Sequence, residues 1–392
     1  MSNPKPLSYG VLQVILQHVE PILRFRLAHH LPSIQNAEKL APMLIKTLEI
    51  KASAIQIDGV SFSLEIMEYH RNCIPRLNTL RNWFNPAKML GEVDKYGIRL
   101  PPMESLTPGD IVIGDFPREI TEEDDLNKLH HIIQSREGRN VAIWQHFIEK
   151  YRRRKENLEP TSQLFLVLKT QKDNLEHREA LVYRQNLGAA MKYLTGKLLG
   201  GRSLKIKNLE LCGGDWPVFR FPIDLKLNVQ NLEVSGIKKN LNAVQSILCP
   251  LSFPLRSISV DQFTQADSEF LKSAKLLINR ENFVIPRHRR VHLPHVLNIG
   301  RGVQVLIRKW QREAPKVETH VSFAMFATDV ESVAKVLEKN PEEFLREGSI
   351  VPLNKDWEIH IYTSDNTIDI SPIVSKTLLL NLKIQHKNNI DI

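Results

Sequence analysis

An amphipathic pattern opens the chain, within residues 6–34. Its apolar positions are Leu7, Val11, Leu12, Ile15, Leu16 and Val19. From Val11 onward these are one, three or four residues apart, which places them on one face of a helix. Pro21 lacks the amide hydrogen that a helix interior needs, so it marks a break. A second apolar set follows, formed by Phe25, Leu27 and Leu31. Two helices this short do not bury two apolar faces alone, so we expect them to pack on the rest of the chain or on a partner.

Alternating apolar and polar residues predict strands after this helical pair. Residues 36–42 are predicted as a link to a first strand, Leu44–Ile50, in which apolar side chains alternate with polar ones. Ala54–Ile66 is predicted to form a hairpin, because Asp58-Gly59 lies between two alternating runs and Asp-Gly is a strong hairpin signal.

The middle of the chain combines turns, a short strand and charged helices. Pro108-Gly109 predicts a type II turn that leads into the strand Ile111–Ile113. Helices are predicted at Ile120–Gln134 and Val141–Lys155. The second ends in the basic block Lys150–Lys155, which is favourable at a helix C-terminus. A solvated helix end is therefore the favoured interpretation of this block, and a binding patch is the alternative.

The second half of the chain predicts strands that alternate with helices. The predicted helices include Asn186–Gly201, Lys239–Leu248, Asp267–Arg280 and Asn298–Pro315. Leu232, Ile258 and Phe283 fall about one leucine-rich-repeat length apart, although no clean repeat signature is present. Two architectures stay open: a degenerate solenoid-like array and an ordinary α/β sheet with right-handed crossovers. Both require parallel strands, because each strand is followed by a helix long enough to cross over.

The predicted fold class is thus α/β, with a short N-terminal helical segment followed by a strand–helix body. We predict a helical segment at 1–35, a strand, hairpin and irregular region at 36–117, a charged helical region at 118–160 and an α/β body at 161–392. The body is the region expected to bind a substrate or another partner.

Composition narrows the class of protein. The 392 residues are 42 % hydrophobic, which is enough for a sizeable core. A net charge of +9 would attract nucleic acid or acidic surfaces, but the basic residues are mostly scattered and no nucleic-acid motif accompanies them. Three cysteines without CxxC spacing argue against a disulfide framework or a zinc site. No segment has the pattern of a signal peptide or a membrane span, so we expect an intracellular protein, cytoplasmic or nuclear, with no membrane partner.

The sequence carries few signs of catalytic or cofactor chemistry. Gly196-Lys197 lacks the hydroxyl residue and the upstream glycine of a phosphate-binding loop. His288, His292 and His295 lie close in sequence, but no cysteine or carboxylate accompanies them, so a basic surface loop is favoured over a metal site. No nucleophile lies in a known catalytic context. We therefore predict no enzymatic activity, no cofactor and no metal.

The opening stretch resembles an F-box. Leu7 matches the leucine that opens the family pattern, Val11-Leu12 and Ile15-Leu16 match its apolar pairs, Val19 its helix-end leucine, and Glu20-Pro21 its turn, while Ser8 stands where the pattern has proline. The whole chain is similar to the nematode F-box C proteins, which carry a nematode-specific domain. Segments of that group recur here in order, at Pro6–Tyr9, Arg24–Leu27, Leu31–Ile34, Asp94–Gly97, Leu106–Ile111 and Phe253–Leu255.

This resemblance implies a substrate-recruiting adaptor of a cullin–RING ubiquitin ligase of the SCF type. The F-box-like helices would dock on a Skp-type adaptor subunit, and the C-terminal body would hold a protein substrate that the sequence does not identify. The implied partner-binding residues are Leu7, Val11, Leu12, Ile15, Leu16, Val19 and Pro21. The alternative is a protein-interaction or structural protein outside the ligase system, whose F-box-like helices pack on its own body. Nucleic-acid binding through the basic clusters is a third, less favoured hypothesis.

Overall fold

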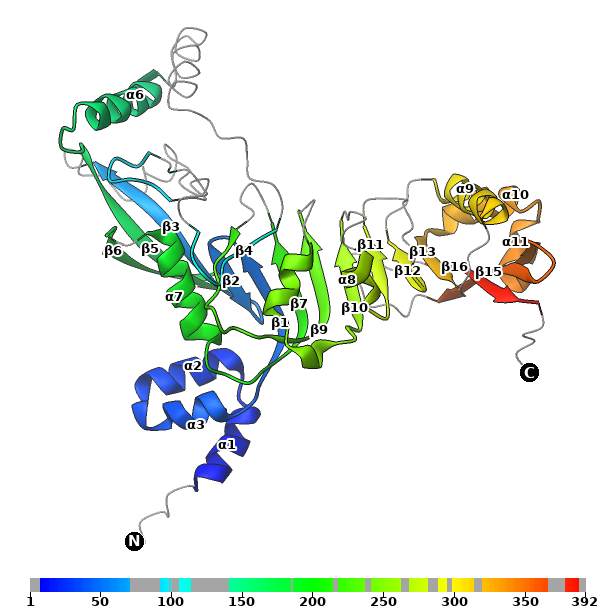
Figure 1. Cartoon of the computed structure of the whole chain (residues 1–392), viewed down its shortest axis with the longest axis horizontal. Coiled ribbons are helices and arrows are strands. Elements are labelled where there is room, and N and C mark those ends of the chain that lie inside the picture. The colour runs from blue at the N-terminus through cyan, green and yellow to red at the C-terminus, as the bar shows by residue number, and fades with distance from the viewer. Residues whose placement is uncertain are drawn as a thin grey trace. The chain divides into compact units, whose positions relative to one another are not determined.

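A computed structural model describes residues 8–70, 92–98, 100, 106–113, 141–184, 186–213, 218–236, 241–261, 268–280, 288–294, 298–313, 319–365 and 378–387 (Figure 1). The chain divides into two compact units, each of them mixed α/β. The first contains Met1–Val229 and Ser246–Cys249, and the second contains Gln230–Gln245 and Pro250–Ile392. Four predictions fall outside the described residues: the placement of Leu7, the helix Ile120–Gln134, and the positions of Phe283 and His295.

The first unit combines N-terminal helices with a mixed sheet. Its helices are α1 (Tyr9–Gln17), α2 (Pro21–His30), the 3-10 turn η1 (Pro32–Ile34), α3 (Gln35–Leu40), α6 (Val141–Lys155) and α7 (Leu187–Leu199). Its strands are β1 (Met43–Lys51), β2 (Ala54–Ile57), β3 (Val60–His70), β4 (Ile111–Val112), β5 (Ser162–Lys172), β6 (Leu175–Val182), β7 (Leu204–Cys212) and β8 (Val218–Phe219). The sheet order is β7-β1-β2-β3-β5-β6, with β1 and β7 parallel and the other pairs antiparallel, while β4 and β8 form a separate pair.

The predicted hairpin is confirmed. β2 and β3 are antiparallel, with Ile57 opposite Val60, so Asp58-Gly59 forms the two-residue turn. Both turn residues have positive φ, which this kind of tight hairpin turn requires. The Asp58 carboxylate also accepts the backbone N–H groups of Lys46 and Thr47, each at 2.9 Å. The turn therefore stabilises the adjacent strand β1 as well as its own hairpin.

The predicted link at residues 36–42 is wrong, because α3 occupies most of it. This helix buries only Ala37 and Glu38, and leaves Leu40 exposed. A helix that buries one small apolar residue and one carboxylate carries almost no hydrophobic periodicity. The chain therefore opens with three short helices, and α2 begins at Pro21 as the predicted break requires.

The second unit has a mixed sheet with helices over one part of it. Its helices are the 3-10 segments η4 (Leu241–Ile247), η5 (Pro250–Ser252) and η7 (Ala327–Asp329), with α8 (Ser268–Lys272), α9 (Ile299–Arg312), α10 (Val330–Val336) and α11 (Pro341–Glu347). Its strands are β9 (Asn228–Ser235), β10 (Ser257–Val260), β11 (Leu277–Asn279), β12 (Arg290–Leu293), β13 (His320–Met325), β14 (Ser349–Pro352), β15 (Trp357–Asp365) and β16 (Leu378–His386). The order is β14-β15-β16-β13-β12-β11-β10-β9.

The prediction of parallel strands is confirmed for β9 to β13. Leu232, Ile258, Leu277 and Val291 are successive register partners across four of these strands. Their spacing falls from 26 residues between Leu232 and Ile258 to 14 between Leu277 and Val291. Connections this uneven do not form the regular repeat of a solenoid. The fold is mixed α/β, as the predicted fold class requires.

The predicted helix Asp267–Arg280 is wrong in its second half. Helix α8 ends at Lys272, and Leu277–Asn279 forms the buried strand β11 between β10 and β12. A short run of consecutive apolar residues fits a buried parallel strand as well as a helix, and periodicity does not separate the two.

One apolar core of the second unit lies between helices and strands at its C-terminal end. Val303, Leu306 and Trp310 of α9 pack with Val321 and Phe323 of β13 and with buried residues of α10, α11, β15 and β16. Figure 1 shows α9 and α10 beside each other in this part of the chain. None of the described helices combines the length and the apolar character that crossing a bilayer requires.

Candidate functional site

Two side chains, those of Asn186 and Glu92, bind the backbone N–H groups in the first turn of α7. Asn186 is the N-cap, and its side-chain oxygen accepts the Ala189 N–H at 2.6 Å. The Glu92 carboxylate accepts the N–H groups of Leu187 at 2.8 Å and Gly188 at 2.5 Å. These contacts satisfy backbone donors that have no partner within the helix. The predicted helix Asn186–Gly201 is confirmed, with Gly200 as its C-cap.

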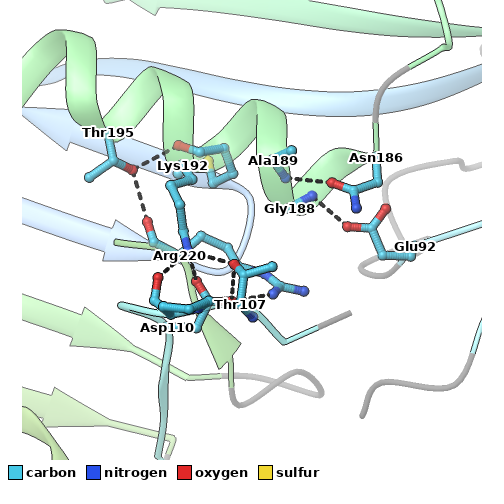
Figure 2. Close-up of polar contacts among 11 residues, drawn as sticks. Glu92, Thr107, Asp110, Asn186, Gly188, Ala189, Lys192, Thr195 and Arg220 are labelled. Atoms are coloured by element: carbon cyan, nitrogen blue, oxygen red, sulfur yellow. Dashed lines mark hydrogen bonds and ion pairs between the residues drawn. The ribbon is translucent and has the colours of Figure 1, made fainter. Parts of the chain in front are cut away.

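Asp110 is the centre of a second set of contacts beside α7 (Figure 2). Its carboxylate lies 2.8 Å from Lys192 Nζ and 2.6 Å from an Arg220 guanidinium nitrogen, and it accepts the Thr107 N–H at 2.8 Å. Lys192 also donates to the Thr107 hydroxyl at 2.6 Å and to the Pro108 carbonyl at 2.8 Å. The side chain of Asp110 is only 2 % exposed. These contacts hold the segment Leu106–Ile111 against α7 and against Arg220, the residue after β8. We call this arrangement the junction.

This junction predicts a loss of stability in acid. Burial alone would raise the pKa of Asp110, but hydrogen bonds from Lys192, the Thr107 N–H and Arg220, together with the Arg220 charge, outweigh it and hold the pKa below its usual value. A carboxyl group with a lowered pKa stabilises the fold above the pKa it has when unfolded, about 3.9, and that stabilisation is lost as the pH falls through its folded pKa.

We expect the free energy of unfolding of the first unit to fall in this acid range, and to fall less steeply in Asp110→Asn. Urea unfolding at a series of pH values measures both slopes. An identical slope in Asp110→Asn would contradict the role of this carboxylate.

The segment Asp94–Gly97 is also a structural turn. The Asp94 carboxylate accepts the N–H groups of Tyr96 at 2.9 Å and Ile98 at 3.0 Å, and its second oxygen lies 3.1 Å from Arg154 Nε. Two of the segments that carry the family resemblance therefore act within the fold. In both segments the aspartate binds backbone N–H groups and a basic side chain of the same unit.

Most cations of the basic block at the end of α6 pair with carboxylates. Lys150 is buried and lies 2.5 Å from Glu68. Arg152 and Arg153 both bind Glu149, at 2.7 Å each. Those hydrogen bonds lower the pKa of Glu149 to about 2. Cations already matched by carboxylates offer little to a phosphate backbone, which argues against a binding patch. The predicted solvated helix end fits Arg152 and Lys155, which are exposed, and is wrong for Lys150, which is buried.

A buried ion cluster fixes the N-terminal helices. Arg24 of α2 is fully buried, and it donates to the carbonyl oxygens of Glu38, Ala41 at 2.8 Å and Pro42 at 2.9 Å. The Glu38 carboxylate of α3 lies 3.3 Å from Arg24 and accepts two hydrogen bonds from Arg202, at 3.0 and 2.9 Å. Arg202 follows α7, so the cluster joins α2 and α3 to the body of their unit.

The residues predicted to bind a partner do not share one face. Leu16 is buried and Leu12 is half-buried, and both pack with Ala37 of α3 and Ala41. Val19 is half-buried, and Pro21 is buried at the start of α2. This part of the predicted set faces the protein's own chain.

The other predicted residues face solvent. Val11 is 47 % exposed and Ile15 is 44 % exposed. Sequence reasoning missed Val14, which is 56 % exposed and lies three residues from Val11 on the same side of the helix. It also missed Leu23 of α2, which is 49 % exposed. We call Val11, Val14 and Ile15 the outer α1 face. The signal for it was present, because two apolar stripes on one short helix imply two different neighbours.

Two of the neighbouring histidines, His288 and His292, are buried. His288 is buried, both its ring nitrogens contact backbone groups, and burial lowers its pKa. His292 is buried in β12 and contacts Ser322 at 2.9 Å, so the predicted surface loop is wrong for both histidines. Cys212 contacts Glu49 at 3.3 Å, close to Glu210, a grouping with the donor chemistry of a metal site. Lys51 lies 2.6 Å from the same Glu49 oxygen and already supplies a positive charge there.

Part of the chain matches a known protein-family model. A family model described as a domain of unknown function (DUF3557) matches residues 186–327. The matched range begins at the N-cap of α7 and ends just after β13. Searches of curated proteins and of solved structures found no match. The matched range does not include α1 to α3, so the resemblance of those helices to an F-box stays a prediction.

Proposed function

We propose that this protein is a substrate-recruiting adaptor of a cullin–RING ubiquitin ligase, of the nematode F-box C type. In this proposal α1 and α2 dock on a Skp-type subunit, and the body that carries the DUF3557 match binds a protein substrate. The observation that carries it is the outer α1 face, three apolar residues that stay exposed at the end of the chain that resembles an F-box. A Skp-type partner would place the protein inside the cell, in the cytoplasm or nucleus.

The outer α1 face suits docking because its helix is already held in place. The inner residues Leu12 and Leu16 pack on α3, and the Arg24–Glu38–Arg202 cluster fastens α2 and α3 to the body. A partner would therefore bind a preformed helix and would not have to order a flexible segment, which lowers the entropic cost of association. An adaptor also needs no catalytic residue of its own, in keeping with the predicted absence of enzymatic activity.

The two sides of α1 give a direct test. We expect Val11→Asp combined with Ile15→Asp to abolish co-purification of a Skp-type subunit with the full chain, since each change puts a carboxylate into the apolar contact. Both positions are exposed, so the thermal midpoint should stay close to that of the wild type. Pull-down with a purified Skp-type subunit, together with circular dichroism melting, measures both effects.

A matched control separates this contact from a general loss of apolar surface. Ile223 is 69 % exposed in the same unit, and Ile223→Asp should leave the pull-down unchanged. Leu16→Asp is a poor test, because this residue is buried and its replacement would unfold the helices whatever they bind. If the variant with both α1 changes still recovers the subunit at the wild-type level, the adaptor proposal fails.

A second candidate function rests on the inner side of the same helices. Leu12 and Leu16 pack with α3, and Pro21 is buried, as expected for an interaction or structural protein outside the ligase system. In that case the wild-type chain would not bind a Skp-type subunit at all. Absence of wild-type binding would therefore favour this candidate.

A further inference from the structure

Strand β6 is an exposed edge of the sheet in the first unit. All eight of its residues are exposed, and Leu175 and Leu181 reach 79 % and 69 %. It pairs with β5 on one side, and within the part of the chain that the structure describes no strand pairs with its other side (Figure 1). An exposed strand edge offers unpaired N–H and C=O groups that another strand can bind.

The length and sequence of β6 lack the features that prevent pairing at an exposed strand edge. The terminal strand of the second unit, β14, has four residues and ends in Pro352, which cannot donate a backbone hydrogen bond. β6 is twice as long and contains neither proline nor glycine. Its charged side chains discourage unspecific pairing, so a partner strand must match them in register.

The sequence of β6 matches itself when read in the opposite direction. Leu175, His177, Glu179 and Leu181 alternate along the strand and therefore share one face. If two copies pair antiparallel about Arg178, Leu175 lies opposite Leu181 of the second copy, and His177 lies opposite its Glu179. Each match occurs twice because the arrangement is two-fold symmetric. Apolar and hydrogen-bonded pairs directly opposite each other are the stabilising units of an antiparallel sheet.

The other face tolerates the same register. Arg178 would meet Arg178 of the second copy, and each pairs with its own Glu176, 2.5 Å from its Nε, which weakens their repulsion. Glu176 also binds Lys169 of β5 at 2.6 Å. On the first face, Leu181 lies opposite Leu166 of β5 within the chain. Pairing would continue this apolar row to Leu175 of the second copy.

We propose that β6 is a self-complementary docking edge for a second copy of this chain, with the two β6 strands paired antiparallel about Arg178. The resulting dimer has one continuous sheet across the two first units. This proposal stands apart from the adaptor function, since it involves neither the outer α1 face nor a Skp-type subunit.

The test measures the mass of the full chain in solution over a range of concentrations, by sedimentation or light scattering. The wild type should move toward twice the chain mass of 45.1 kDa as its concentration rises. His177→Glu places a carboxylate opposite Glu179 at two symmetric positions and should raise the dissociation constant by about tenfold. His177→Glu combined with Glu179→Lys restores opposite charges in the same register and should restore the dimer.

Two further variants test whether dimerisation depends on β6 alone. Leu175→Asp should weaken the dimer as His177→Glu does, and Leu251→Asp, at a position 80 % exposed in the second unit, should not. All these side chains are exposed, so the variants should keep the wild-type circular dichroism spectrum. A wild type that stays monomeric at every concentration overturns the proposal, and so does a dimer that ignores His177→Glu. Failure of the double variant to recover would reject the register about Arg178.

Discussion

Replacing Glu38 by glutamine should lower the free energy of unfolding of the N-terminal helices by about 3–5 kcal/mol. The Glu38 side chain is 1 % exposed and lies between Arg24 and Arg202, which are 0 % and 6 % exposed. Glutamine keeps the volume and removes the negative charge. Two guanidinium groups would then share a buried space without a counter-ion, the arrangement that makes breaking a buried ion pair so costly.

The pKa of Arg24 reflects the same balance between burial and neighbouring charges. Burial lowers the pKa of Arg24, while Glu38 raises it and Arg202 lowers it further. With the carboxylate gone, only the unfavourable influences remain. The hydrogen bonds from Arg24 to the carbonyl oxygens of Ala41 and Pro42 remain in Glu38→Gln. We therefore expect the N-terminal helices to loosen while the sheet of the unit persists.

Hydrogen exchange is the appropriate measurement, because two units need not unfold in one step. The Ala41 N–H, which bonds to the Ala37 carbonyl, reports on the end of α3. Its protection should fall in Glu38→Gln and stay near the wild-type level in Lys39→Gln, which changes the exposed neighbour on the same helix. Equal protection in Glu38→Gln and the wild type would show that the cluster contributes nothing net to stability.

The ion cluster also explains which parts of the N-terminal fold the sequence could predict. The helix break at Pro21 and the helix around Leu16 follow from proline chemistry and apolar spacing, which are local properties. Helix α3 depends on Glu38 being buried by Arg202, a residue far along the chain. No local pattern reveals such a contact, so the segment was predicted as a link.

The outer α1 face was predictable only in part, because tertiary packing also decides which side of α1 is exposed. Spacing alone placed Val11 and Leu12 in one set, because both are apolar and the helix is short. Only the packing of α3 decides that Leu12 faces inward and Val11 outward. The same limit applies to Leu277, whose apolar run fitted a helix until its pairing with Ile258 placed it in a strand. Local signals identify elements, and tertiary contacts decide which of their faces stay free.

Gly109→Ala should destabilise the first unit by about 3–5 kcal/mol, and Gly59→Ala by only about 1–2 kcal/mol. Both glycines lie in turns with positive φ, +93° and +86°, so alanine meets a similar backbone penalty at each. Their surroundings differ. A Cβ at Gly109 would lie 2.5 Å from the Phe221 carbonyl oxygen and 2.9 Å from the Ile223 nitrogen, whereas at Gly59 nothing lies within 4 Å.

The difference between the two variants therefore measures the close approach of the Gly109 turn to the segment after β8. Backbone atoms cannot rotate away as a side chain can, so the turn itself must shift, and it carries Thr107 and Asp110 with it. Urea unfolding gives the loss of stability, and the acid dependence assigned to Asp110 should weaken in Gly109→Ala and persist in Gly59→Ala. If both variants lose the same stability, the turn is not packed on that segment. A larger loss at Gly109 would show that the segment Leu106–Ile111 requires glycine for packing as well as for turn geometry.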